Sequence, residues 1–142
     1  MNKLYDNFLN LILTSSLDLI NDTLKVALVS SEFSTEEPYQ FFSDVVEEVS
    51  GIGYESGGKE ILSRSFVTTA EAISLVAPDV TWEDSTIEAS GAIVYKDTGD
   101  ASTSPLLCYY PIEGGSVSSA LSTFTVKWGI NGVFRFSTGE SQ

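Results

Sequence analysis

The sequence contains no histidine and only one cysteine, and these two shortages exclude much of the common catalytic and metal chemistry. Without histidine the chain can form neither a Ser-His-Asp nor a Cys-His catalytic set, and no imidazole can bind zinc. A single cysteine excludes an intrachain disulfide, and the place of Cys108 between Leu107 and Tyr109 predicts a small buried strand residue rather than a nucleophile. We therefore expect a protein that is not an enzyme, with no catalytic residue and no cofactor.

Basic residues are also scarce. Seven Lys and Arg stand against 20 Asp and Glu, which gives a net charge of −13. The basic residues are scattered, whereas nucleic acids and anionic membranes are bound by clustered ones. We expect neither a nucleic acid nor a membrane as partner. The simplest interpretation is that the acidic residues keep the protein soluble. The alternative is that they bind a partner with a basic face.

Long hydrophobic runs are absent. A bilayer span needs roughly 18–20 apolar residues, and the longest run, residues 8–13, is interrupted by Asn10. Asp6 and Asn7 stand where a secretory leader would be basic, so we expect synthesis in a reducing cytoplasm.

The acidic residues offer the remaining possibility of a metal site, through oxygen ligands. Asp79, Glu83 and Asp84 are the best cluster, but a calcium loop needs a glycine at its sharp turn and none is present there. We interpret this cluster, and the weaker one at Asp97 and Asp100, as solvated turns and expect no metal.

What is present is the composition of an ordinary folded domain, with 42% hydrophobic and 11% aromatic residues. A chain of 142 residues predicts one domain over residues 1–142, with an N-terminal helical segment at 1–14 and a tail at 138–142. Apolar residues recur at helical spacing and predict a helix from Lys3 to Leu13. This helix is expected to plug the open end of a sheet, although its spare apolar arc could contact another subunit.

The densest strand signal lies at residues 24–29, where both alternating faces are largely apolar. Such a strand is usually central in its sheet and covered on both sides. A second short helix is expected from Pro38 to Val46. Further strands are expected at 61–69, 70–77, 80–82, 86–96, 106–112, 123–130 and 133–137.

Two details of these strands are specific predictions. Asn131-Gly132 predicts a hairpin between the last two strands. Ile87, Ala89, Gly91, Ile93 and Tyr95 are expected to share one face of a single long strand. Together these features predict a mainly β fold, an antiparallel β-sandwich or jelly-roll-like barrel with one or two short helices in its N-terminal half.

Several aromatic and apolar residues could form a binding face, because such residues are enriched at interfaces. The predicted partner contacts are Leu4, Tyr5, Phe8, Tyr39, Phe41 and Phe42. Trp82 or Trp128 could instead stack on a sugar, which would make the chain a carbohydrate-binding module. Trp128 alternates with Phe124 and Val126, which favours a place in the core.

Several segments resemble, in the same order, a family of small virion structural proteins of tailed bacteriophages. The resemblance runs from about Leu9 to Phe136 and is carried by residues 16–29, 41–44, 48–54, 57–59, 79–82, 91–99 and 102–106. The segment Gly91-Ala92-Ile93-Val94-Tyr95-Lys96-Asp97-Thr98-Gly99 is an example. One departure is Ser15-Ser16, where the family pattern has glycine.

The resemblance implies a non-enzymatic component of the virion. We expect a capsid decoration, or cement, protein on the outer head, with the major capsid protein as its partner. Proteins of this kind commonly associate with themselves, so a dimer or trimer is expected. A tail- or fibre-associated protein that contacts the host surface is the alternative.

Overall fold

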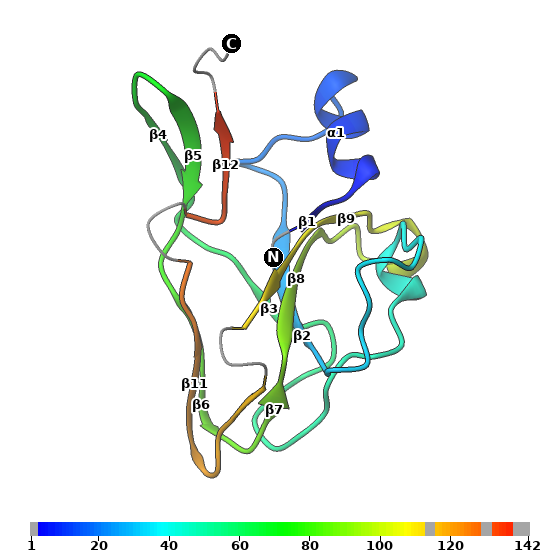
Figure 1. Ribbon diagram of the computed structural model, residues 1–142, viewed down its shortest axis with the longest axis vertical. Coiled ribbons are helices and arrows are strands. Elements are labelled where there is room, and N and C mark those ends of the chain that lie inside the picture. The colour runs from blue at the N-terminus through cyan, green and yellow to red at the C-terminus, as the bar shows by residue number, and fades with distance from the viewer. Residues whose placement is uncertain (1–2, 113–115, 129–131, 138–142) are drawn as a thin grey trace.

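The computed structural model describes residues 3–112, 116–128 and 132–137, and for Lys3 and Ser137 the backbone alone. The fold is mainly β, as predicted: its sheets are antiparallel, and α1 (Asp6–Leu13) is the α-helix among these residues (Figure 1). The described strands do not close into a barrel. The strands are β1 (Lys3–Leu4), β2 (Leu24–Val29), β3 (Lys59–Glu60), β4 (Ser65–Thr68), β5 (Ala72–Val76), β6 (Val80–Ser85), β7 (Glu88–Ala89), β8 (Gly91–Lys96), β9 (Leu106–Pro111), β10 (Val117–Ser118), β11 (Ser122–Val126) and β12 (Phe134–Ser137).

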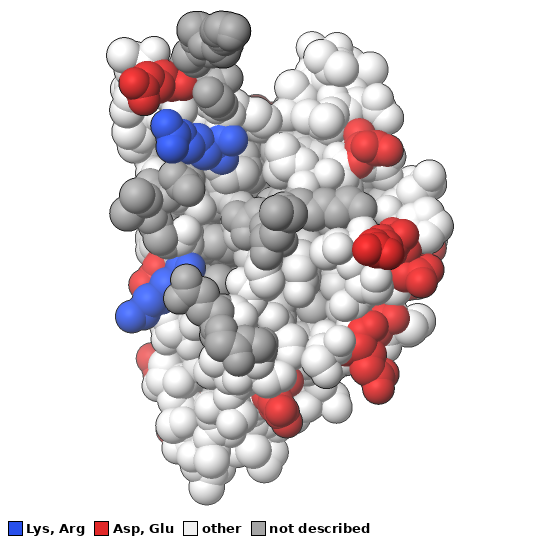
Figure 2. Space-filling view, viewed as in Figure 1, with Lys and Arg blue, Asp and Glu red and all other residues white. Residues whose placement is uncertain are grey.

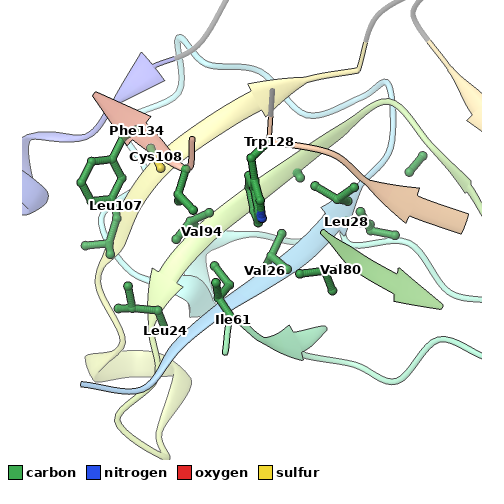
Figure 3. Close-up of a cluster of buried hydrophobic side chains, with 14 of the residues drawn as sticks. Leu24, Val26, Leu28, Ile61, Val80, Val94, Leu107, Cys108, Trp128 and Phe134 are labelled. Carbon is green, nitrogen blue, oxygen red and sulfur yellow. The ribbon is translucent and has the colours of Figure 1, made fainter. Parts of the chain in front are cut away.

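The sheets form two layers around a hydrophobic core. A five-stranded sheet has the order β1-β9-β8-β2-β3. The sheet β12-β5-β4 and the pair β11-β6 lie on the other side of the core, at the left of Figure 1. Side chains from both layers meet in one cluster, part of which Figure 3 shows, including Leu24, Val26, Val80, Trp128 and Phe134. This arrangement is that of a sandwich.

Strand β2 is the central strand that its sequence predicts. It pairs with β8 along its whole length and with β3 on its other side. Leu24, Val26 and Leu28 enter the main core, whereas Ala27 and Val29 enter a second cluster on the opposite face. Both faces of the strand are thus covered, which is why both alternating sets of residues are apolar.

The second face of the sheet is covered by the loop that follows β2. Phe33 stacks between Tyr39 and Tyr109, at ring-centroid distances of 5.2 and 5.0 Å. Phe42 stacks on Tyr95 at 4.2 Å with the ring planes nearly parallel. The helix expected from Pro38 to Val46 is reduced to a 3₁₀ turn, Phe42–Asp44. The aromatic residues of this segment stack on the sheet instead of forming one side of a helix.

The strand expected at residues 86–96 is broken at Ser90. Strand β7 pairs with β10, whereas β8 pairs with β2 and β9. Ile87 and Ala89 therefore lie in the main core while Ile93 and Tyr95 lie in the second cluster, so these residues do not share a face. Gly91 follows the break, and a Cβ there would lie 2.5 Å from the Tyr109 ring, so the close approach requires glycine.

The predicted C-terminal hairpin is not formed. Asn131 lies outside the described residues, but the strands on either side of it belong to different sheets: β11 pairs with β6 and β12 pairs with β5. The tail expected at residues 138–142 also lies outside the described residues.

Candidate binding groove

Helix α1 packs on the sandwich through one aromatic residue. Phe8 is fully buried, and its ring lies 4.8 Å from the Phe134 ring and 5.8 Å from the Phe136 ring of β12. Leu9 and Leu13, one helical turn apart, lie on the same side of the helix and remain 43% and 81% exposed. The helix thus covers part of the β12-β5-β4 sheet and leaves an apolar side uncovered. The helix begins at Asp6 rather than at Lys3 as predicted, because Lys3 and Leu4 form β1 and pair with β9.

The helix ends in a Schellman motif that turns the chain sharply. The Ser16 amide donates to the Leu11 carbonyl and the Ser15 amide donates to the Ile12 carbonyl, at 2.8 and 3.1 Å. Ser15 has φ 59°, the left-handed conformation that favours glycine. This turn directs residues 17–19 back along the helix.

The segment after this turn is held by side-chain hydrogen bonds. The Asp18 carboxylate accepts the amides of Ile20 and Asn21, both at 3.0 Å, and the Asn21 side chain at 2.8 Å. The Asn21 side chain is the largest cause that lowers the pKa of Asp18. Arg64, just before β4, donates to the carbonyls of Ile20 and Asp22. The segment is therefore fixed to the base of the β4–β5 hairpin.

These elements enclose an open apolar groove of about 810 Å³. One wall is α1 with the segment after it, and the other is the outer part of the β12-β5-β4 sheet, so that Figure 1 shows α1 and the sheet at opposite sides of the upper end. Figure 2 shows the notch between them. The groove is lined by Leu9, Ile12, Leu13, Ser15, Leu17, Asp18, Leu19, Phe66, Ile73 and Phe136.

The chemistry of this groove suits binding rather than catalysis. Among the described residues that line it, Asp18 is the single ionisable one, and its carboxylate is occupied by the hydrogen bonds described above. An exposed apolar surface that is concave and bounded by fixed elements is typical of a docking site for an apolar side chain or segment. A hollow beside Tyr5 and Tyr39 measures about 130 Å³.

The structure divides the six predicted partner contacts into different places. Tyr5 and Phe8 are 3% and 0% exposed and belong to the two core clusters, so both are removed from the predicted contact surface. They are buried because β1 and α1 turn these side chains onto β9 and β12. Leu4 is 37% exposed on the edge strand β1, so it stays a predicted partner contact.

The three predicted contacts in the loop are half-buried packing residues. Phe41 forms a bridge to Pro105. The Tyr39 hydroxyl donates to Glu47 at 2.8 Å, and burial is the largest cause that raises the pKa of Tyr39 to about 12. Phe42 is occupied by Tyr95, as described above. None of the six lines the groove between α1 and β4.

The residues considered for chemistry are also placed by the structure. Cys108 is fully buried, and burial raises the pKa of its thiol to about 12, so it is the packing residue that the sequence predicts. Trp128 is 9% exposed in the main core, as predicted, and Trp82 is 1% exposed. Neither indole offers an open face to a sugar ring.

The acidic cluster at Asp97 and Asp100 is occupied within the protein. Asp97 pairs with Lys25 at 2.9 Å and accepts the Gly99 amide, while Asp100 accepts the Ser102 amide. Among the residues that the structure describes, no three Asp, Glu or Cys side chains gather as a metal site would require.

The groove itself was only partly foreseeable. Leu9 and Leu13 belong to the apolar arc that the sequence offers for a second subunit. Phe66, Ile73 and Phe136 carry no sequence signal of their own, because they meet the helix only after three strands have paired.

No helix in the described part of the chain is long and apolar enough to cross a membrane. Comparison of the chain with protein-family models, with curated proteins and with solved structures found no match.

Proposed function

We propose that this chain is a non-enzymatic virion structural protein that decorates the capsid of a tailed bacteriophage and seats a segment of the capsid protein in the groove between α1 and the β12-β5-β4 sheet. The single observation that carries the binding role is the groove of about 810 Å³ with Leu13 81% exposed at its rim. The assignment to a virion is supported by the resemblance of residues 9–136 to small phage structural proteins.

Two further features agree with this proposal. The net charge of −13 suits a protein that works beside packaged DNA without binding it, and it favours a partner surface with basic residues. A rigid groove also loses little conformational entropy on binding, which suits a protein present in many copies with modest individual affinity.

The first test is to locate the chain in the virus particle. Electron cryo-microscopy of virions of the phage that encodes it is expected to show density for the sandwich on the outer capsid lattice. Density on the tail alone would favour the tail- or fibre-associated alternative, and density at neither place would contradict a virion role.

The second test concerns the groove. Replacing Leu9 and Leu13 together by Gln removes the exposed apolar wall of α1 while keeping good helix formers in the helix. Burial of two partly exposed leucine side chains contributes about 2–4 kcal/mol, so we expect the affinity for capsids that lack the chain to fall by about 30- to 700-fold.

The matched control is Val46→Gln, which removes an apolar side chain that is 82% exposed outside the groove. Binding is measured by cosedimentation with the capsids, and each variant is checked by near-ultraviolet circular dichroism. Equal binding by the wild type and the double variant would show that another surface meets the capsid.

A further inference from the structure

Strand β4 is an exposed edge of its sheet. It pairs with β5 alone, at the outer left of Figure 1, and all four of its residues are exposed. Phe66 and Val67 are 45% and 48% exposed although they are large apolar residues. Natural edge strands are usually protected by a charge, a proline or a bulge, and β4 has none of these.

The hydrogen-bond pattern shows which backbone groups face outward. The Thr69 amide donates to the Ala72 carbonyl at 2.8 Å, so Thr69 and Ala72 form a hydrogen-bonded pair at the end of the hairpin. Pairs of this kind alternate along an antiparallel ladder. The N–H and C=O groups of Phe66 and Thr68 are therefore directed away from β5, toward the free edge.

The local charges at this edge favour a second copy of the chain as its occupant. Two copies with net charge −13 repel each other over most of their surfaces. Residues 65–70 carry no charge, and the flanking residues Arg64 and Glu71 have opposite signs. Antiparallel pairing brings Arg64 of one copy toward the Glu71 turn of the other, so that no like charges oppose each other.

We propose that β4 pairs with β4 of a second copy in a two-fold antiparallel dimer, in which Phe66 of each copy forms the hydrogen-bonded pair with Thr68 of the other. This register uses both residues whose backbone groups face outward. It places Val67 beside Val67 of the second copy at the two-fold axis, and it sets an aromatic against a β-branched residue in each flanking pair.

The pairing joins two three-stranded sheets into one of six strands. Because the two-fold axis is perpendicular to the sheet, each copy presents the same face on the same side. Phe66 lines the groove of its own copy, so the two grooves open on one side of the dimer. Two linked grooves would bind a repetitive surface more tightly than one. The dimer itself does not depend on the capsid role and is tested without capsids.

The first test traps the dimer through the axis residue. In the proposed register the Cα atoms of the two Val67 residues lie about 4.5 Å apart, within the range that a disulfide needs. Purified Val67→Cys chain is expected to form a covalent dimer under mild oxidation, because the native Cys108 is buried and does not compete.

Ser65→Cys is the matched control, since Ser65 is exposed on the same face of β4. Its two copies would lie roughly 13 Å apart across the dimer, too far for a disulfide. Selective trapping of Val67→Cys supports the register. Equal trapping of both variants, or of neither, overturns it.

The second test removes an outward amide without removing a β4–β5 hydrogen bond. Thr68→Pro eliminates one N–H in each copy, and Thr68→Ala keeps it. Loss of two hydrogen bonds per dimer is expected to raise the dissociation constant by about 5- to 140-fold for Thr68→Pro, measured by sedimentation velocity over a concentration series.

Three results of that measurement would overturn the proposal: a wild type that stays monomeric at every concentration, a trimer, or a dimer that Thr68→Pro leaves unchanged. Should Thr68→Pro lose its native circular dichroism, the cysteine pair decides the question alone. Loss of capsid binding by the groove variants leaves this dimer unaffected, so the two proposals fail separately.

Discussion

Trp128 joins three parts of the chain through a single side chain. Its indole nitrogen donates to the Pro78 carbonyl at 3.0 Å, between β5 and β6, and its ring meets the edge of Tyr110 on β9 at 5.6 Å. Only 9% of the residue is exposed, in the core that Figure 3 shows. Trp128 therefore stabilises the fold by connecting the two layers of the sandwich.

We expect Trp128→Ala to lower the free energy of unfolding by about 3–5 kcal/mol, because it removes a large buried ring and leaves a cavity. Trp128→Phe keeps an aromatic ring and loses the hydrogen bond to Pro78 together with a smaller part of the buried ring, so its cost should be smaller. Urea unfolding followed by circular dichroism measures both. An alanine variant of normal stability would show that the indole does not support the core.

Single residues also show that loop aromatics can serve packing, whatever contact they make with a partner. Tyr39 and Phe42 stand in a segment without regular structure, which the sequence marks as exposed. In the structure both cover the second face of the five-stranded sheet. A loop that closes a core has the same composition as a loop that offers an interface, and only the paired strands beneath it distinguish the two.

At the scale of elements, the backbone conformation at the end of α1 is unfavourable for the residue there, and a substitution can relieve this. Ser15 occupies a left-handed conformation that disfavours side chains by roughly 1 kcal/mol. Ser15→Gly relieves this conformation but also raises the entropy of the unfolded chain. We expect it to stabilise the protein by about 0.5–1 kcal/mol before that entropy is subtracted. Thermal or urea unfolding measures the change.

The neighbouring residue provides the control for this prediction. Ser16 follows in the same motif but has no left-handed φ, so glycine there relieves nothing and should be neutral or destabilising. A Ser15→Gly variant less stable than the wild type would mean that the serine side chain supports the turn more than its backbone conformation costs.

The elements differ in how far their sequence determined them. Strand β2 was predictable because burial on both faces leaves an apolar residue at almost every position. The break between β7 and β8 was not, because apolar residues alternate without interruption across Ser90 while the chain passes from one pairing to another. The Asn-Gly signal failed similarly, since the strands around it found partners elsewhere.

The candidate groove was likewise predictable from the sequence only in part. Its helical wall follows from the spacing of Leu9 and Leu13, which local sequence sets. Its other wall requires β4, β5 and β12 to pair across more than sixty residues of chain, and Phe66 becomes a lining residue only then. Local patterns predict which faces are apolar, whereas tertiary pairing decides which of those faces remain open.

At the scale of the whole molecule, the net charge of −13 acts oppositely on the two proposed associations. The dimer through β4 brings like-charged bodies together and is held by uncharged strands. The capsid surface is expected to attract the acidic protein. Added salt shortens the Debye length from about 30 Å at 0.01 M to about 8 Å at 0.15 M, which weakens both long-range effects.

We therefore expect sodium chloride to tighten the dimer and to weaken binding to capsids. Sedimentation velocity of the wild type at low and high salt measures the first effect, and cosedimentation with capsids at the same concentrations measures the second. Thr68→Pro is the control, because its weakened dimer removes self-association from the capsid measurement. A dimer that dissociates as salt is added would contradict pairing through the uncharged edge and would assign self-association to opposite charges elsewhere on the surface.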